Sequence, residues 1–199
     1  MVYCPNQLQG IGQKNRTWVS NAGSLTFSLI AVTHEMLSLT PLELALLCRN
    51  FIFDTFQIDL KLKWPNDLVD VQNKKYGGIL CHSRRKFVVA GIGLNLFPIE
   101  NQKLEQFQIG YIFSKKTMDN FNFLLQLVEY IVTHRYKDSA QISNDWIAHC
   151  SHLNKLVRLE DEAQKISGTF LGLGKFGEAQ VLDQAGKIHH ITNGSFTIY

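Results

Sequence analysis

Residues 87–96 constrain the fold most, because this segment is nearly continuous in apolar character. Its sequence, Phe-Val-Val-Ala-Gly-Ile-Gly-Leu-Asn-Leu, predicts a central strand that is covered on both faces of a sheet. Gly91 and Gly93 have no side chain, so another group can approach the backbone closely there. Asn95 interrupts the run near its end, and a buried asparagine needs hydrogen-bond partners, one of which a ligand could supply.

The segments on either side of this strand predict helices beside a sheet. Residues 24–32 alternate as a strand does, and residues 41–56 carry a broad apolar face at helical spacing. Thr40 is expected to cap that helix, with Pro41 in its first turn. The other expected elements are a strand that ends at Cys4, a hairpin around 72–74 that leads into a strand over 75–80, a helix over 119–137 capped by Asp119, and a helix over 138–149 that docks through Trp146 and Ile147.

Beyond His152 the sequence changes to short alternating segments separated by glycines. This sequence pattern predicts a small antiparallel barrel whose last strands cover 187–191 and 195–199. A chain of 199 residues can hold one full core and a small satellite domain. We therefore expect two domains, residues 1–152 and residues 153–199.

Composition excludes several classes of protein. Hydrophobic residues make up 45% of the chain, which argues against disorder, and a net charge of +3 is too small and too scattered to indicate nucleic-acid binding. The four cysteines are far apart and are expected to be reduced thiols. Residues 1–10 show no export signal and the apolar run over 87–97 is too short for a bilayer, so a cytoplasmic protein is expected. Residues 149–152 place three metal donors together without a distant fourth, so no metal site is expected.

Residues 58–67 form the first candidate functional segment. Ile58, Leu60 and Leu62 alternate with polar residues as in a strand, and the run Trp-Pro-Asn-Asp at 64–67 then turns the chain. Lys63 therefore lies at the carboxyl end of a strand, where open α/β sheets bind ligands. Two interpretations stand at this point: Lys63 binds an anionic substrate, or it is a solvated lysine at a strand end.

Residues 7–18 form the second candidate segment, a polar loop with glycines at positions 10 and 12. Backbone N–H groups exposed by glycine can hold an anion, and Arg16 could clamp it. A Gly-x-Gly pair is also common in surface loops, so the residues alone leave both interpretations open.

Three ordered motifs together give this sequence a resemblance to a known family. They are Lys-Trp-Pro-Asn-Asp at 63–67, Lys-Tyr-Gly-Gly-Ile-Leu at 75–80, and Gly-Ile-Gly-Leu-Asn-Leu at 91–96. In this order and spacing they resemble the catalytic domain of biotin–protein ligases, in a short form without a DNA-binding domain. The resemblance implies an α+β fold with a mixed central sheet and flanking helices, like the class II aminoacyl-tRNA synthetases, followed by an SH3-like β-barrel.

The resemblance also assigns roles to individual residues. Lys63 and Arg16 are expected to act in catalysis by neutralising negative charge. The residues expected at biotin are Gln7, Gly10, Ile11, Gly12, Gln13 and Lys63, and those expected at the nucleotide are Trp18, Lys75 and Asn95. The implied reaction uses ATP with Mg²⁺, forms biotinyl-5′-adenylate, and transfers the biotinyl group to a lysine of a biotin carboxyl carrier protein or domain of a biotin-dependent carboxylase. A homodimer is considered as its assembly.

The loop departs from the family's pattern at three positions. Ile11 and Gln13 stand where arginines are typical, and Asn15 stands where a glycine is typical. Fewer guanidinium groups near the adenylate phosphate predict weaker retention of the intermediate.

The family's domain also begins with an earlier strand, a helix and a biotin-binding segment that this sequence does not include, so an upstream start and a shortened protein are both open. The alternatives are a lipoate or octanoyl ligase of the same fold and a degenerate relative without catalysis.

Overall fold

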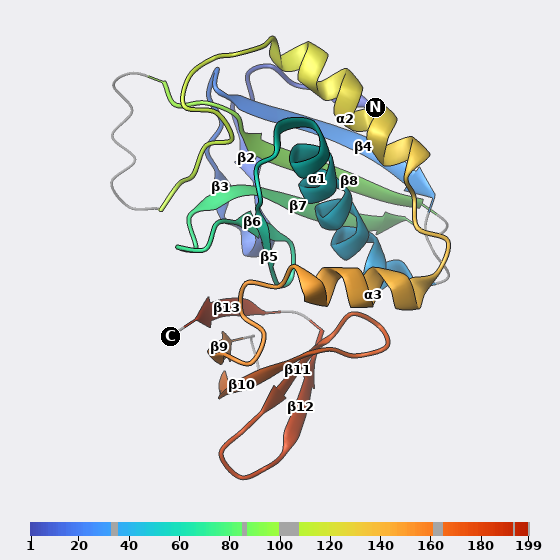
Figure 1. Ribbon diagram of the computed structural model, residues 1–199, viewed down its shortest axis with the longest axis vertical. Coiled ribbons are helices and arrows are strands. Elements are labelled where there is room, and N and C mark those ends of the chain that lie inside the picture. The colour runs from blue at the N-terminus through green and yellow to red at the C-terminus, as the bar shows by residue number, and fades with distance from the viewer. Residues whose placement is uncertain (33–35, 85–86, 100–107, 161–164, 193, 199) are drawn as a thin grey trace.

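The protein is an α+β structure in which helices lie on one face of a central antiparallel sheet. The computed structural model describes residues 1–32, 36–84, 87–99, 108–160, 165–192 and 194–198. Figure 1 shows this layer of helices and sheet with a second, smaller sheet beneath it. The central sheet has the strand order β1-β4-β8-β7-β6-β5. Its strands are β1 (Val2–Tyr3), β4 (Ser24–Val32), β5 (Lys61–Lys63), β6 (Asp67–Val69), β7 (Lys75–Arg84) and β8 (Phe87–Asn95).

All the described ladders of the central sheet are antiparallel. Parallel pairing occurs at two single bridges, Leu62 with Cys150 and Lys75 with Ile109. A mixed sheet was expected, and among the described residues these two bridges are its parallel part.

Three α-helices in the described part of the chain accompany the central sheet: α1 (Thr40–Phe56), α2 (Asn120–Thr133) and α3 (Ser139–Ala148). Apolar side chains of α1 pack with buried residues of β8 in one core, and Phe51 of α1 meets Phe123 of α2 edge to face at 5.2 Å between ring centroids. Edge-to-face geometry is favourable for aromatic rings, so this contact adds to the apolar burial. Asp119 caps α2, as predicted, by accepting hydrogen bonds from the backbone N–H groups of Phe121 and Asn122.

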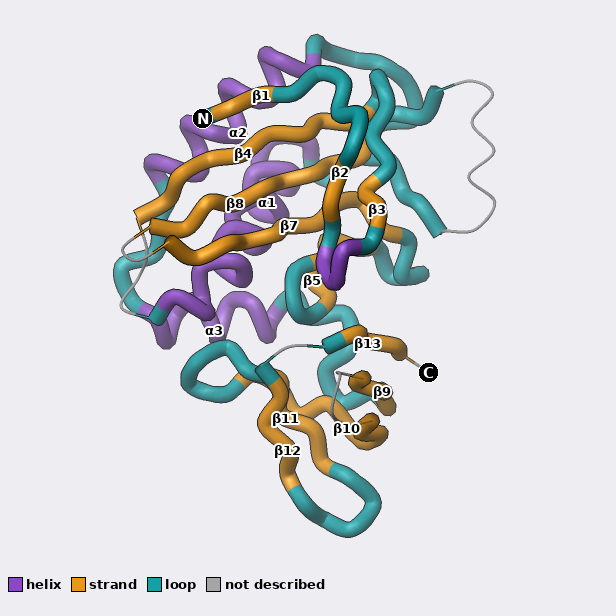
Figure 2. The backbone as a smooth tube through the Cα atoms, turned by 180° about the vertical axis from the view of Figure 1, so that it is seen from behind, coloured by secondary structure: helices purple, strands orange, loops and turns teal. Residues whose placement is uncertain are grey.

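The opposite face of the central sheet is covered only in part. A two-stranded hairpin of β2 (Gly10–Ile11) and β3 (Thr17–Trp18), joined by a 3₁₀ turn at Gln13–Asn15, crosses this face (Figure 2). Along β8, Phe87 is 51% exposed at one end, whereas Gly93 and Asn95 are buried at the other. The prediction that this strand is covered on both faces therefore holds only at its carboxyl end, because the hairpin reaches no further.

Several predicted helix and strand boundaries are wrong. The helix expected over residues 119–137 ends at Thr133, and the strand expected over 75–80 extends to Arg84. Thr40 does not cap α1: it already has helical backbone angles because a 3₁₀ turn at Leu37–Leu39 leads directly into the helix, and no capping bond forms. The strand expected from Ile58 begins at Lys61, because its partner β6 offers only three paired residues. The carbonyl of Leu60 accepts a hydrogen bond from Arg49 Nε at 3.1 Å instead of joining the ladder.

The smaller sheet contains five antiparallel strands in the order β12-β11-β10-β9-β13. They are β9 (Leu156–Glu160), β10 (Lys165–Leu173), β11 (Ala179–Leu182), β12 (Ile188–Ile191) and β13 (Ser195–Ile198). The short antiparallel strands match the prediction, and the described pairings leave β12 and β13 at the two ends of the order. Tyr199, predicted in the last strand, lies outside the described residues. Among the described residues, no helix combines the length and apolar character needed to cross a membrane.

Candidate active site

The turn that contains Lys63 joins two short strands and is fixed at both ends. Lys63 of β5 pairs with Asp67 of β6 across the turn, and the peptide bond between Trp64 and Pro65 is cis. Asn66 is buried, and its side-chain amide donates to the carbonyl of Ile79 on β7. The backbone N–H of Ile79 donates in return to the carbonyl of Asn66 at 3.0 Å. The turn is therefore held in place by the adjacent strand, which positions Lys63 and Asp67.

Trp64 connects this turn to the smaller sheet. Its side chain is 2% exposed, and its indole N–H donates to the carbonyl of Gly177 at 3.0 Å. Its ring also lies 6.1 Å from that of Phe196 on β13. Because Gly194 and Phe196 line the same pocket as Lys63, the smaller sheet forms one wall of the candidate site.

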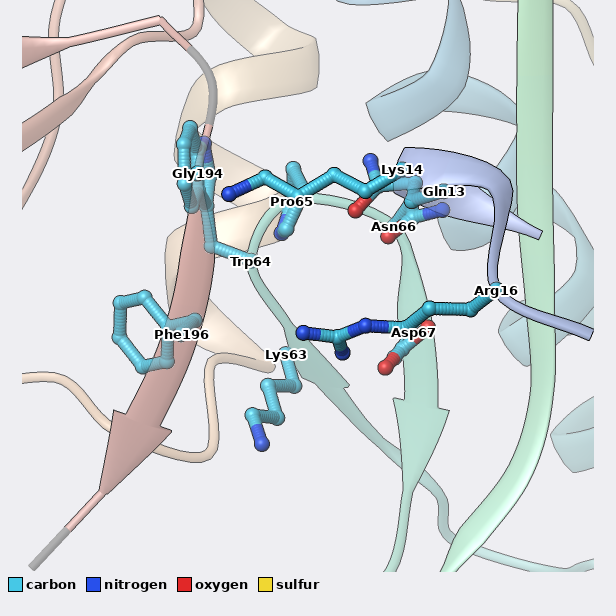
Figure 3. A pocket seen from close by; sticks show the side chains of 10 residues that line it. All are labelled: Gln13, Lys14, Arg16, Lys63, Trp64, Pro65, Asn66, Asp67, Gly194 and Phe196. Carbon is cyan, nitrogen blue, oxygen red and sulfur yellow. The ribbon is translucent and has the colours of Figure 1, made fainter. Parts of the chain in front are cut away.

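A pocket of about 100 Å³ opens beside the turn (Figure 3). Its walls come from the hairpin turn, the segment around Lys63 and the smaller sheet. It is lined by Gln13, Lys14, Arg16, Lys63, Trp64, Pro65, Asn66, Asp67, Gly194 and Phe196. Three of these residues are cations and one is a carboxylate, so the pocket is suited to an anionic ligand.

Lys63 is the half-buried cation of this pocket. Burial lowers the pKa of its ammonium group, the positive charges of Lys75 and Arg16 lower it further, and the carboxylate of Asp67 opposes them. Within the described residues the ammonium group of Lys63 makes no hydrogen bond or ion pair, although Asp67 lies near enough to affect its pKa. A charge that is partly desolvated and not paired gains most from binding an anion, which favours the interpretation of Lys63 as a ligand-binding residue.

Arg16 and Gln13 reach the pocket from the hairpin. The backbone N–H of Gly12 donates to the carbonyl of Arg16 at 2.7 Å and closes the hairpin turn, in which Lys14 and Asn15 have positive φ angles of 54° and 57°. Figure 3 shows the Arg16 guanidinium group extending across the pocket between Lys63 and Asp67. The two predicted charge-neutralising residues, Lys63 and Arg16, are thus brought to one pocket from segments far apart in the sequence.

The other residues expected at biotin lie outside the pocket lining. Ile11 is 63% exposed on the hairpin and points away from the sheet side that Trp18 occupies. Gln7 lies beside Gly10, where a side chain would meet the carbonyl of Trp18 at 2.3 Å. Gly10 is therefore required by the close hairpin packing, while Gly12 serves the turn.

The residues expected at the nucleotide form a second group next to the pocket. The indole ring of Trp18 lies on Gly93 of β8 so closely that a methyl group there would come within 2.5 Å of it. Lys75 Nζ lies 5.6 Å from the center of the Trp18 ring and forms an ion pair with Asp67 Oδ1 at 2.5 Å. Asn95 donates to the Lys75 carbonyl at 3.0 Å. Asp67 thus links the lysines of both groups, because it pairs with Lys75 and lies across the turn from Lys63.

Seven pocket residues were not expected as site residues from the sequence: Lys14, Trp64, Pro65, Asn66, Asp67, Gly194 and Phe196. Residues 64–67 belong to the same motif as Lys63, which could have indicated them. Lys14 lies in the loop but carries no local signal of its own. Gly194 and Phe196 come from the smaller sheet, and nothing in their local sequence indicates that they face a site more than a hundred residues away.

Comparison with known proteins covers the hairpin and the Lys63 turn of this site. The description of the family model that matches residues 2–96 is biotin/lipoate A/B protein ligase family. The solved structure of biotin protein ligase from Aquifex aeolicus in complex with biotin and ATP aligns over 99% of this chain and 87% of that chain, with a TM-score of 0.84 and 27% identity. Residues 2–96 therefore match the biotin/lipoate A/B protein ligase family, and the chain as a whole is similar in fold to a biotin protein ligase.

Further biotin protein ligases show how far the similarity extends. Biotin--protein ligase 2 and chloroplastic biotin--protein ligase 1 of Arabidopsis thaliana are each 34% identical over 102 residues, which cover 45% of this chain. The match spans only 31% and 28% of their lengths, under a third of each. The Leishmania major biotin protein ligase with biotinyl-5-AMP is 19% identical, with a TM-score of 0.62 over 96% of this chain and 87% of that one, and it shares the fold.

Proposed function

We propose that this chain activates biotin with ATP to form biotinyl-5′-adenylate and transfers the biotinyl group to a lysine of a biotin carboxyl carrier domain. The observation that carries the proposal is that Lys63 and Arg16 line one pocket. The chain around this pocket aligns over 99% of its length with a ligase bound to biotin and ATP. The pocket lies where residues 1–152 meet residues 153–199, which we propose as two domains.

In the first step a biotin carboxylate oxygen attacks the α-phosphorus of ATP, and pyrophosphate leaves. Two anions must approach each other, and their repulsion is the main obstacle to the reaction. Lys63 and Arg16 line the place where they would meet and supply two positive charges in a partly desolvated pocket. Lys75, held by Asp67 and Asn95, places a third charge beside Trp18 for the nucleotide.

In the second step the amine of the acceptor lysine attacks the acyl carbon, and AMP leaves with the bonding electrons. The same cations stabilise the leaving phosphate, so no protein nucleophile is required.

A Mg²⁺ ion that accompanies the triphosphate fits the residues of this pocket. Mg²⁺ usually keeps several waters and binds one or two carboxylates together with substrate phosphates. The pocket offers Asp67, and the described residues contain no group of three metal-binding side chains that would hold an ion alone. Asp67 would hold the ion together with the phosphates, and the ion would supply further neutralisation of phosphate charge.

The three loop residues that differ from the family's pattern are expected to affect retention of the adenylate unequally. Gln13 lines the pocket, whereas Ile11 faces solvent and Asn15 lies in the turn with positive φ. The loss of an arginine at position 13 therefore removes a charge from the pocket itself, and faster release of the adenylate is expected mainly from this position.

The test is biotin-dependent exchange of pyrophosphate into ATP. Lys63→Ala should reduce exchange by about 10²-fold or more, because it removes a positioned charge from the site. Lys175→Ala changes an exposed lysine in the turn before β11 and is the matched control. Exchange that survives Lys63→Ala unchanged would disprove the assignment.

Two further arms of the experiment separate the alternatives. Lipoate or octanoate in place of biotin tests for a ligase of the same fold with another substrate. Calorimetric titration with biotin and with ATP tests for a relative that binds without catalysis. Turnover with lipoate alone, or binding without exchange, would replace the proposed reaction.

A further inference from the structure

Lys14 crosses the mouth of the candidate active site. It lies in the hairpin turn, and its side chain extends from there toward Gly194, which directly precedes β13 of the smaller sheet (Figure 3). Its ammonium group donates to the carbonyl of Glu160 on β9 at 2.9 Å. Lys14 lines the same pocket as Lys63 and Arg16, so an amine stands at the place where an acyl adenylate would be formed and held.

The contacts of the neighbouring lysines distinguish Lys14 from them. Lys75 is held by the carboxylate of Asp67 at 2.5 Å, and Lys63 lies deeper in the pocket, where its charge is needed to bind the anion. Lys14 is exposed and is held by one hydrogen bond to a backbone carbonyl. That bond uses one N–H and leaves the lone pair of the neutral amine available for attack.

We propose that Lys14 is a self-modification site, at which the enzyme acylates its own hairpin with the biotinyl group of the adenylate. This inference rests on the proposed function, because it needs the adenylate to bind in this pocket. An amine held beside an activated acyl group reacts faster than one in solution, because the two groups no longer have to meet by diffusion. Lys14 lines the same pocket as Lys63 and Arg16, which we propose to bind the adenylate.

The reaction balances without any further reagent. The neutral Nζ of Lys14 forms an amide bond with the acyl carbon of biotinyl-5′-adenylate. The bond between that carbon and the phosphate oxygen breaks, and AMP leaves with the electron pair. The proton lost from the lysine nitrogen passes to water.

Acylation would change the hairpin as well as mark it. The positive charge at position 14 is lost, and the ammonium group that donates to Glu160 becomes an amide N–H at the end of a bulky group. The contact between the hairpin and the smaller sheet would then be weakened, and the pocket would open on that side.

The experiment supplies synthetic biotinyl-5′-adenylate to the full chain and maps modified lysines by peptide mass spectrometry. Supplying the adenylate bypasses activation, so a failure of the ATP-dependent step is measured separately by pyrophosphate exchange. We expect Lys14 to carry about 10-fold more label than the exposed lysines Lys116, Lys175 and Lys187.

Two variants complete the design. Lys14→Arg keeps the charge and can still donate to the Glu160 carbonyl, but a guanidinium group is a poor acyl acceptor. It should lower the total label several-fold, whereas Lys175→Arg should not. Equal labelling of all exposed lysines, labelling of Lys63 in place of Lys14, or an unchanged total in Lys14→Arg would overturn the proposal, even if exchange proceeds normally.

Discussion

Gly93 is the position at which a single methyl group should disturb the site most. A Cβ atom there would lie 2.5 Å and 2.6 Å from two atoms of the Trp18 ring. Carbon atoms pack at about 3.5–4.0 Å, so the indole would have to move by about 1 Å. Gly91, two residues earlier on the same face of β8, is the matched control, because its Cβ would meet nothing closer than 3.7 Å.

The hairpin is expected to yield rather than the sheet. β2 and β3 share only two paired positions, and an isolated two-stranded hairpin is marginally stable. Overpacking usually costs about 1–3 kcal/mol, and here most of it should appear as displacement of the hairpin rather than as loss of global stability. We expect Gly93→Ala to lower the free energy of unfolding by about 1 kcal/mol and to weaken ATP binding about 10-fold.

Tryptophan fluorescence reports the displacement directly. Trp64 and Trp146 are 2% and 1% exposed, so a change in exposure would come from Trp18. Gly93→Ala should shift the emission to longer wavelength, with urea unfolding and ATP titration measured on the same samples. If Gly93→Ala and Gly91→Ala give the same spectrum, stability and ATP affinity, the close contact of Trp18 with β8 is not part of the nucleotide site.

Three further predictions concern the wider site. Lys63→Met should raise the Tm near neutral pH, because burial lowers the pKa of Lys63 and the charged lysine therefore destabilises the folded state. The gain should shrink as alkaline pH discharges the wild-type lysine, and a pH-independent gain would contradict this. Burial lowers the pKa of His152 from 6.5 to about 3, so wild-type stability should fall as pH drops from 6.5 toward 3, and His152→Gln should flatten that slope in urea unfolding. Trp64→Phe should cost about 1–3 kcal/mol in urea unfolding, since it leaves the Gly177 carbonyl unpaired; a loss below about 0.5 kcal/mol would mean that water replaces the bond.

The local sequence was sufficient for elements whose pattern is long and regular. The strand over residues 24–32 was predicted with the bounds that β4 has, and the helix over 41–56 differs from α1 by one residue. Capping was predictable at Asp119, whose extended backbone leaves its carboxylate free to accept from the helix. It failed at Thr40, because the preceding 3₁₀ turn, which the sequence did not reveal, had already set a helical backbone.

The candidate site was predictable in part for the same reason. Lys63 was found because an alternating run ends in a turn, and three motifs in order indicated the family. The exposure of Ile11 and the pairing of Lys75 with Asp67 were not predictable, because they depend on how the hairpin and β6 meet the sheet.

The sequence by itself determined the long strands, the helices and the chemical groups that this protein can bring to an anion, but not the short strands of the hairpin. Hydrophobic periodicity and turn residues act over a few positions, so the elements they specify can be predicted from the local sequence. Tertiary structure alone decided that Lys14, Lys63 and Phe196 share one pocket, since their contact depends on packing between segments far apart in the chain. It also decided the low pKa of His152, because only packing against Trp146, Phe170 and Phe196 removes that side chain from water.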